Sequence, residues 1–238
     1  MKPLGHKAYG SIPHLPSIKR GPGDHGLEEE QAALLTGART LPGLEVYVQE
    51  KLDGSCMSVA KIGGMIVALG RAGYLAESAP FEHCQLFAPW VAARAARFDA
   101  LLSEGERVVG EWMLMATAIR YWIPEPDALF VAFDIMRGHE RATPREVESR
   151  CAQLGLRSSR IVYGGAVEPE DVYHMVRIRP TFAAEAEPEG LIYRAVRDGK
   201  VSFLGKWTRG DFDPGRYLGQ DVYNYPPQWL RPATSEAA

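Results

Sequence analysis

The sequence has few cysteines and no long hydrophobic run. Its 238 residues include only three cysteines, Cys56, Cys84 and Cys151, which lie far apart and form no CxxC pair. Such sparse and odd-numbered cysteines argue against a disulfide framework and favour a reducing compartment, so we expect a cytoplasmic protein. No apolar stretch approaches the length that crosses a bilayer, and residues 1–6 have no signal core. We therefore expect no membrane association.

The chain also has little net charge and no metal-binding pattern. It carries 27 Lys and Arg against 30 Asp and Glu, a formal charge of −3. No global basic field draws it to nucleic acid, so any nucleic-acid site must be a local patch. The six histidines show no zinc-ligand spacing. The length and the ordinary globular composition suit one domain spanning residues 1–238.

The N-terminal region, residues 1–26, is rich in proline and is expected to be an irregular arm. Within it, Gly21 to Gly26 matches the GxGxxG pattern of dinucleotide-binding loops. That pattern requires a preceding strand, which is missing here, and Pro22 removes one of the amide donors that such a loop supplies. We favour a plain turn, although a tight loop beside a ligand remains an alternative.

The stretch from Val46 to Val59 is a strand run interrupted by Lys51-Leu52-Asp53-Gly54. A strand end fixes a reactive side chain at the mouth of a cleft. An acid two residues after the lysine can tune it, and glycine lets the backbone approach a ligand closely. These are the requirements of a covalent lysine nucleophile. The alternative is a surface lysine that precedes an ordinary Asp-Gly turn.

A two-residue hairpin at Gly63-Gly64 is predicted to return the chain toward this lysine. Pairing Ile62 with Met65 across the turn sets Arg71 opposite Cys56. Arg71 is therefore expected near Lys51 and Asp53.

Two further strands are predicted at residues 107–114 and 129–136, both mostly apolar. The first carries a single acid, Glu111, which is either a solvent-exposed strand end or a site group, because an unpaired buried carboxylate is costly. The second contains Phe130 and Phe133, of which one at least is expected in the core. Helices are predicted at residues 27–38, 82–103, 143–154 and 168–178.

A second hairpin is predicted at Asp198-Gly199. Pairing residues 197 and 200 across it places Lys206 opposite Leu191, with Glu189 on the same side of the sheet as Leu191. An acid and a lysine would thus converge at the open end of the hairpin. The tail, residues 211–238, is proline-rich and expected to be irregular.

Taken in order, these motifs resemble the signature of covalent nucleotidyltransferases, the superfamily of ATP-dependent RNA ligases, DNA ligases and mRNA capping enzymes. Within it, the chain most resembles RNA ligases of the nick-sealing phage type, over residues 46 to 209. The matching elements are Lys51 to Gly54, Arg71, Glu111, Phe130 to Ile135, Glu189 to Ile192, and Lys206. Each motif alone is weak, and their order and spacing carry the resemblance.

The resemblance implies roles around the reacting phosphate. Lys51 would attack the α-phosphate of ATP, expel pyrophosphate and hold AMP as a phosphoramidate. Lys206 would neutralise the α-phosphate, and Glu189 would orient the lysine or a metal-bound water. Mg²⁺ or Mn²⁺ would be held by Glu189 and Glu111, in part through water, and by ATP itself.

The resemblance also implies roles around the nucleoside. Glu50 would lie beside the adenine and Asp53 near the ribose, with Gly54 allowing close approach of the backbone. Arg71, together with Glu111, would bind sugar or phosphate. Phe133 would stack on the adenine.

The implied fold is α+β, with antiparallel sheets that form an ATP cleft flanked by helices. The implied activity joins an RNA 5′-phosphate to a 3′-hydroxyl, with an end-healing kinase or phosphatase as a candidate partner. A DNA ligase, a GTP-using capping-type enzyme, and a module that binds adenylate or RNA ends without sealing them remain alternatives. About thirty residues after Lys206 leave no room for an OB domain, and Leu204 stands where a second lysine is common. Nicked and single-stranded substrates both remain open.

Overall fold

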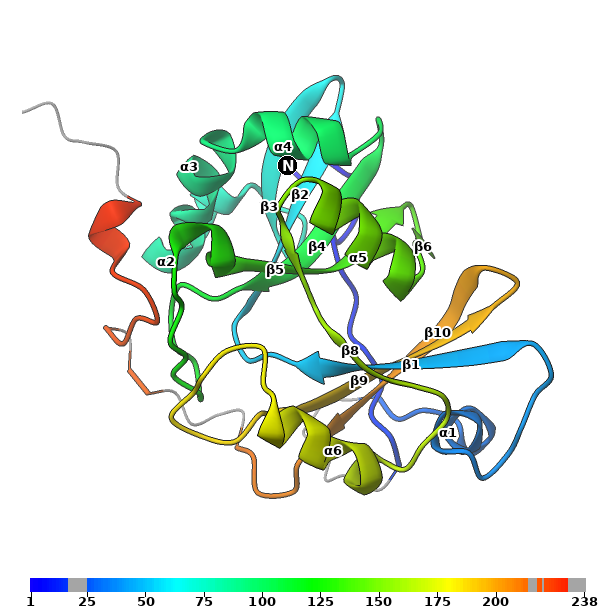
Figure 1. The fold of residues 1–238 in the computed structure, drawn as a ribbon. Helices are drawn as coiled ribbons and strands as arrows, with labels where there is room; N and C mark the ends of the chain where they lie inside the picture. The colour runs from blue at the N-terminus through cyan, green and yellow to red at the C-terminus, as the bar shows by residue number, and fades with distance from the viewer. Residues whose placement is uncertain (17–24, 214–217, 220, 231–238) are drawn as a thin grey trace, which may run out of the picture.

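The computed structural model describes residues 1–16, 25–213, 218–219 and 221–230. Two β-sheets lie one above the other, with helices on their outer sides (Figure 1). The smaller sheet has the strand order β10-β9-β1-β8, and the larger has the order β3-β2-β4-β5-β6 with β7 added beside β5. All of these pairings are antiparallel except that of β5 with β7. The mixed α and β architecture with antiparallel sheets is the one that the sequence predicts.

The smaller sheet is built from the strand that ends at the lysine motif, the second hairpin and one short strand. Its strands are β1 (Leu44–Lys51), β8 (Ile161–Gly164), β9 (Gly190–Arg197) and β10 (Lys200–Thr208). The strands of the larger sheet are β2 (Ser55–Ile62), β3 (Met65–Gly70), β4 (Glu106–Trp112), β5 (Phe130–Arg137), β6 (Glu140–Arg141) and β7 (Arg157–Ser158). Because β1 ends at Lys51 and β2 begins at Ser55, the lysine motif connects the two sheets.

Each sheet has its own hydrophobic core on its outer face. The larger sheet is covered by α2 (Glu82–Gln85), α3 (Phe87–Ala92), α4 (Ala95–Leu101) and α5 (Pro144–Gln153). The smaller sheet is covered by α1 (Glu29–Thr36) and α6 (Pro169–Ile178) (Figure 1). The 3₁₀ turns are η1 (Ala76–Ser78), η2 (Pro126–Leu129) and η3 (Pro227–Trp229). In the described ranges, no helix is long and apolar enough to cross a membrane.

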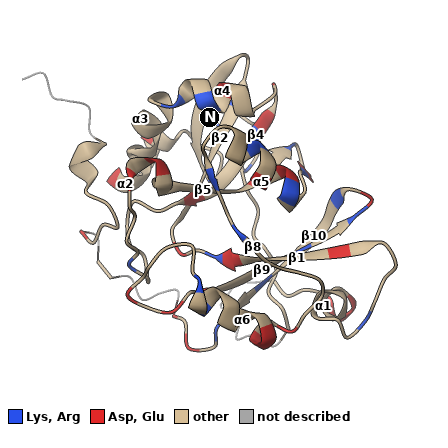
Figure 2. Cartoon of the chain, viewed as in Figure 1, with Lys and Arg blue, Asp and Glu red and all other residues tan. Residues whose placement is uncertain are grey.

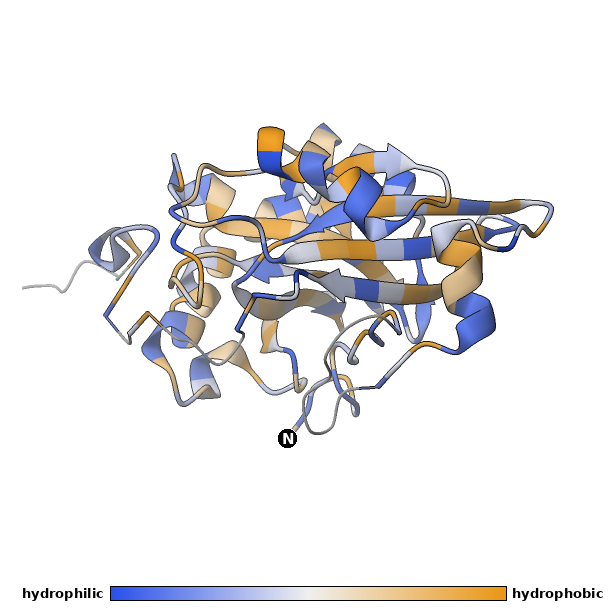
Figure 3. Cartoon of the chain, turned by 90° about the horizontal axis from the view of Figure 1, so that it is seen from below, coloured by the Kyte–Doolittle hydropathy of each residue, from blue (hydrophilic) through white to orange (hydrophobic). Residues whose placement is uncertain are grey.

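Hydrophobic and hydrophilic residues alternate along the strands, as Figure 3 shows from below. In β1, Val46 and Val48 are buried against the helices, and Gln49 and Lys51 belong to the face that looks toward the other sheet. Alternation with a period of two gives each sheet one apolar face and one face that can carry polar groups. The space between the sheets is therefore the place where polar side chains gather.

Two local predictions are confirmed. The first hairpin pairs Ile62 with Met65 and Met57 with Gly70, which is the predicted register. Gly63 and Gly64 both have positive φ values, 58° and 75°, as a type I′ turn requires. The helix predicted at residues 143–154 is also present as α5, and the Thr143 hydroxyl caps its first turn by accepting a hydrogen bond from the Glu146 N–H at 3.2 Å.

The predicted register of the second hairpin is wrong by one residue. Val201 pairs with Val196 as expected, but Phe203 then pairs with Ala195, so Ser202 is an extra residue in β10. From this bulge onward the facing residues shift, and Lys206 lies opposite Ile192 rather than Leu191. A bulge reverses which face the following side chains occupy, and its position cannot be seen in the alternation of the sequence.

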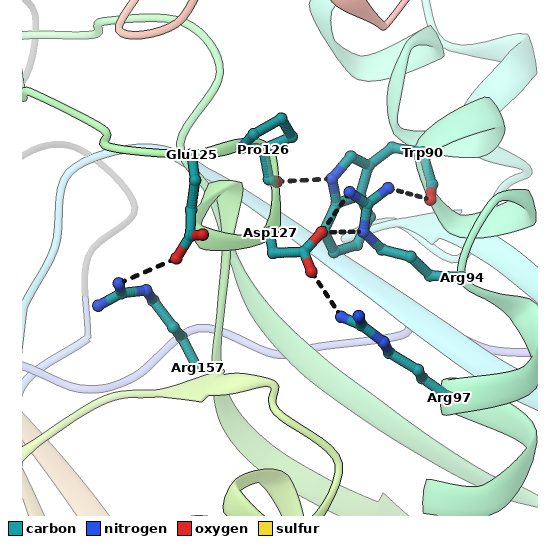
Figure 4. Close-up of polar contacts among 7 residues, drawn as sticks. All are labelled: Trp90, Arg94, Arg97, Glu125, Pro126, Asp127 and Arg157. Carbon is teal, nitrogen blue, oxygen red and sulfur yellow. Dashed lines mark hydrogen bonds and ion pairs between the residues drawn. The ribbon is translucent and has the colours of Figure 1, made fainter.

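The predicted helix at residues 82–103 is three short helices. The break between α3 and α4 falls at Arg94, whose guanidinium lies over the Trp90 ring and binds Asp127 (Figure 4). Arg97 binds the other oxygen of Asp127 at 2.6 Å, and the Trp90 indole N–H donates to the Pro126 carbonyl at 2.8 Å. These contacts fix the helices to the turn that precedes β5.

In its described residues, 1–16 and 25–26, the N-terminal segment has no helix, as predicted, yet it is tightly packed. Ala8, Tyr9 and Leu15 are all at most 4% exposed. Residues 21–24 of the GxGxxG stretch lie outside the described residues, so that interpretation stays untested. In the described part of the tail, the turn η3 and a bridge between Met115 and Tyr223 interrupt an otherwise irregular path.

One buried ion pair joins the two sheets. Arg194 of β9 donates from Nη1 to Asp134 of β5 at 2.7 Å, and neither side chain is more than 2% exposed. Arg194 Nε also donates to Gln49 of β1 at 2.6 Å, and the Tyr9 hydroxyl donates to Asp134 at 2.6 Å. Each charged group is thus hydrogen-bonded on more than one side, which is the condition for tolerating charge in an interior.

We expect Asp134→Ala to lower the free energy of unfolding by roughly 3–5 kcal/mol, because it leaves the buried Arg194 without its carboxylate. Arg194→Ala should cost less, because Arg141 remains 3.5 Å from Asp134. The double variant Asp134→Leu/Arg194→Met should lose much less than the sum of the two. Urea unfolding of the three variants measures this difference. Additive losses would show that the two side chains are not coupled.

Candidate active site

A cleft of about 300 Å³ lies between the two sheets at the end of β1. Nine residues were expected at the nucleotide site, and seven of them line this cleft: Glu50, Lys51, Gly54, Arg71, Glu111, Phe133 and Lys206. The other two, Asp53 and Glu189, stand directly behind it and contact the lysine or its loop. The structure thus gathers at one place residues that are spread over more than 150 positions of the sequence.

Lys51 and Glu189 form the central contact of the site. Lys51 Nζ lies 2.5 Å from Glu189 Oε2, with the lysine side chain 23% exposed and the glutamate side chain 7% exposed. The strand pairing explains the contact, because Lys51 lies opposite Gly190 in the β1–β9 ladder and Glu189 immediately precedes that glycine. Gly190 cannot be replaced, since an added Cβ would lie 2.0 Å from the Trp207 carbonyl oxygen.

The lysine is surrounded by negative charge. Burial disfavours its ammonium, but the carboxylates of Glu189, Glu111 and Asp53 outweigh burial and raise the pKa of Lys51 above its ordinary value. For Glu189, burial raises the carboxyl pKa, and the Lys51 ammonium acts in the opposite direction. In the absence of a bound ligand, Lys51 is therefore protonated and is not a nucleophile.

Glu111 is the acid whose placement the sequence left open, and it belongs to the site. Burial, reinforced by the charges of Glu189 and Asp53, raises the pKa of Glu111 to about 8, while Lys51 opposes the shift. Gly54 packs against the same strand, because an added Cβ would lie 2.9 Å from the Trp112 carbonyl oxygen and 3.0 Å from Glu111 Cγ. Glycine is thus needed here for close contact with β4.

Asp53 holds a loop instead of facing the cleft. Its Oδ2 accepts hydrogen bonds from the N–H groups of Ala118 and Ile119, at 2.7 and 2.9 Å. Its own N–H donates to the Tyr121 hydroxyl at 3.1 Å. The third residue of the lysine motif thus ties the segment after β4 to the lysine, while its charge still acts on Lys51.

Two bulges decide which side chains reach the cleft. The bulge at Ser202 puts Lys206 on the same face as Ile192 and Gln49, which all line the cleft. A second irregularity makes Phe133 an extra residue between the pairs Gly110–Ala132 and Val109–Asp134. Phe133 therefore lines the cleft while its neighbour Asp134 is also free to cross to the other sheet.

Sequence reasoning missed the N-terminal segment, which forms one wall of the cleft. Tyr9, Gly10 and Ile12 all line it, and the Tyr9 ring meets the Phe133 ring edge-on at a centroid distance of 5.2 Å. The segment bonds to both sheets, with Tyr9 N–H donating to the Arg71 carbonyl and Leu15 N–H to the Lys206 carbonyl. Proline content gave a reason to expect an irregular arm, but no sequence pattern shows where an irregular segment packs.

The acidic residues suit a hydrated divalent ion better than an all-protein metal cage. Among the residues that the structure describes, no group of three or more His, Cys, Asp or Glu side chains could hold a metal ion. Glu189 and Glu111 are close enough for each to raise the energy of the other's charge. Two hard oxygen donors fit Mg²⁺ or Mn²⁺ whose remaining ligands are water and phosphate oxygens.

The sequence profile of the RNA ligase family matches residues 44–208. The chain belongs to the RNA ligase family. The match spans every strand of both sheets and leaves out the N-terminal segment that walls the cleft. No curated protein matches this RNA ligase family member in sequence.

Solved structures share the fold at low identity. A mutant of the Naegleria gruberi RNA ligase with AMP and Mn is 21% identical with a TM-score of 0.50, covering 85% of this chain and 60% of its own. The structure of the same enzyme with PPi is 21% identical with a TM-score of 0.50, and the match covers 85% of this chain and 59% of that structure. An archaeal ATP-dependent RNA ligase is 19% identical with a TM-score of 0.47, and the match covers 82% of this chain and 48% of that structure. The chain thus spans about half to three fifths of the length of these structures.

The raised pKa of Glu111 predicts a pH dependence of stability. Between its ordinary pKa near 4.5 and about 8, the folded protein keeps a proton on Glu111 that the unfolded chain has lost. The free energy of unfolding therefore falls as the pH rises through this window. We expect Glu111→Gln, which is permanently neutral, to become more stable relative to wild type from about pH 5 to pH 8. Chemical denaturation across this range tests it, and a constant stability difference would contradict it.

Proposed function

We propose that the chain is the nucleotidyltransferase unit of an ATP-dependent RNA ligase and acts through a lysyl-AMP intermediate. The observation that carries the proposal is the position of Lys51, at a strand end in the cleft and 2.5 Å from Glu189. Arg71 and Lys206 line the same cleft and supply positive charge for phosphate groups. Residues 1–238 would form this unit as a single domain.

In the first step, the bond from Lys51 Nζ to the α-phosphorus of ATP forms as the bond to the pyrophosphate oxygen breaks. The amine must first lose its proton, and Glu189 is placed to accept it or to orient the ammonium. Lys206 and Arg71 stabilise the charge that develops on the phosphate oxygens. A bound Mg²⁺ or Mn²⁺ supplies further positive charge at the phosphates, and cations near Lys51 favour its neutral form.

The cleft walls suit an adenine ring. Phe133 offers an aromatic face from the larger sheet, and Ile192 offers an aliphatic surface from the smaller sheet. Ile12 and the Tyr9 ring close the side that the N-terminal segment covers. A flat apolar slot of this kind binds a base by stacking. Glu50 also lines the cleft, and its backbone would meet the base edge.

In the later steps, the AMP would pass to an RNA 5′-phosphate, and a 3′-hydroxyl would displace it. Membership of the RNA ligase family supports RNA as the substrate. We propose that a nicked duplex, or an end-healing kinase or phosphatase that presents the ends, assists joining. Three alternatives would differ from an RNA ligase in the nucleotide attached or in the strand joined: a DNA ligase, a GTP-using capping-type enzyme and a non-sealing binding module.

We expect labelled ATP with Mg²⁺ to attach AMP covalently to the wild-type protein and GTP to attach none. Lys51→Ala should abolish labelling, and Lys206→Ala should reduce it by about 100-fold or more, because charge stabilisation at the phosphate is lost. Denaturing electrophoresis with labelled nucleotides measures both effects. Lys61→Ala, which removes an ion pair with Asp99 outside the cleft, is the matched control and should label normally. Label that persists in Lys51→Ala would refute the proposal.

Loss of the Ile12 side chain tests the wall formed by the N-terminal segment. We expect Ile12→Ala to weaken ATP binding by about 1 kcal/mol, roughly fivefold, because apolar surface beside the base is lost. The effect should lie in KM for ATP and leave the maximal adenylation rate nearly unchanged. Tyr9→Phe keeps the ring and is the control for the wall itself. An unchanged KM in Ile12→Ala would show that the base lies elsewhere in the cleft.

A further inference from the structure

Most basic side chains of the described residues are paired with carboxylates. Of the six arginines between residues 137 and 160, four form such pairs: Arg141, Arg145, Arg150 and Arg157. Several of the basic residues that form no such pair gather at one place, whereas Arg160 and Arg179, which also form none among the described residues, lie beside each other elsewhere. In the parts of the chain that the structure describes, no carboxylate pairs with Lys2, Lys7, Arg71, Arg107 or Arg137.

These five residues lie on the N-terminal segment or on the turns that hold it. Arg71, just after β3, donates to the Gly10 carbonyl at 3.2 Å. Arg107 of β4 donates to the Ala8 carbonyl at 2.7 Å and to the Gly138 carbonyl at 2.8 Å. The segment is thus bound between the turn after β3 and the turn between β5 and β6.

Both edges of the segment contact these turns. Lys2 Nζ lies 5.1 Å from the centre of the Tyr74 ring on one side, and the His6 and His139 rings lie 5.9 Å apart on the other. Lys7, between these contacts, is exposed, and so is Arg137, which precedes Gly138. Cations from three separate parts of the sequence therefore share one stretch of surface.

Among the described residues none of these cations forms a direct ion pair with a neighbouring acid, although the charges of Glu104 and Glu106 act on Arg137. The partners of Arg71, Arg107 and Arg137 are backbone carbonyls, which carry no net charge. Two nearby carboxylates are engaged elsewhere: Glu104 accepts the N–H groups of Gly63 and Gly64, and Glu140 lies 3.8 Å from Lys200. On a chain of net charge −3, this is a local basic surface of the kind that holds polyanions.

The surface leads directly into the cleft. Arg71 and Gly10 belong to both, since they line the cleft and also hold the N-terminal segment in place. A polyanion bound along Lys2, Lys7 and Arg137 would therefore have one end at Arg71, beside the reactive lysine. The N-terminal residues of this surface, Lys2 and Lys7, lie outside the part of the chain that matches the family profile, whereas Arg71 and Arg137 lie inside it.

We propose that Lys2, Lys7, Arg71 and Arg137, which we call the arm surface, bind the phosphate backbone of the RNA strand whose 5′ end enters the cleft. The proposal rests on the proposed ligase function and adds the place where the substrate is held. The contacts are to phosphates, so they position the strand and carry no sequence preference. Each contact releases condensed counterions, so the arm surface contributes to the salt dependence of RNA binding.

The test uses the full chain with Lys7→Ala/Arg137→Ala, two exposed residues away from the cleft. The control is Arg145→Ala/Lys200→Ala, which also removes one arginine and one lysine, each paired with a glutamate at 3.8 Å. Binding of a 5′-phosphorylated single-stranded RNA is measured by fluorescence anisotropy over a salt series. Covalent labelling by ATP and thermal unfolding are measured on the same samples.

We expect the arm variant to bind the RNA roughly tenfold more weakly, with the slope of log affinity against log salt reduced by about 1 to 1.5. The control variant should match wild type, and both should label with ATP and unfold normally. Wild-type RNA affinity and salt slope in the arm variant, with normal labelling, would overturn the arm surface and leave the ligase proposal standing. If wild type fails to label while the arm variant still loses RNA affinity, the ligase proposal fails and the arm surface stands as an RNA-binding site.

Discussion

The ion pair between Asp134 and Arg194 fixes the distance between the two sheets, and the cleft exists because of that distance. The pair lies on the floor of the space between β5 and β9, and its members are completed by Gln49 and Tyr9. A buried pair of this kind adds little net stability, since desolvation offsets most of the attraction. Its geometry is nevertheless strict, because charged hydrogen bonds tolerate little variation in length or angle. We infer that the pair sets the width available to a base between Phe133 and Ile192.

The site combines a protonated lysine with a buried acid that tends to stay neutral. Lys51 keeps its proton because carboxylates surround it, and Glu111 keeps its own because burial opposes ionisation. In this state both Lys51 and Glu111 hold a proton, and a further positive charge at the centre of the site would be stabilised by the surrounding acids. Binding of a cation would reverse both tendencies together, since it would stabilise the ionised Glu111 and disfavour the Lys51 ammonium. The electrostatics of the site therefore make the reactivity of Lys51 depend on whether a cation is bound.

Much of the site could be predicted from the sequence, and the failures have common physical causes. The hairpin that returns Arg71 depends on two glycines and strict alternation, both of which are visible in the sequence. The position of Lys206 depends on a bulge at Ser202, where the energy of packing against the next layer decides between registers. Asp53 illustrates a different limit, because its motif is visible but its partners at Ala118 and Ile119 belong to a loop that has no pattern. The N-terminal wall was missed for the same reason.

The long reach of the N-terminal segment also has a consequence for the order in which the protein can assemble during synthesis. Tyr9 hydrogen-bonds to a residue 125 positions further along the chain, and Leu15 bonds to the backbone of Lys206 in the last strand. The segment that walls the cleft leaves the ribosome before either partner exists, and it must wait until β5 and then β10 are made. Contacts of such large separation form late and slowly. The larger sheet can therefore fold while translation continues, whereas the cleft closes only when nearly the whole domain has emerged.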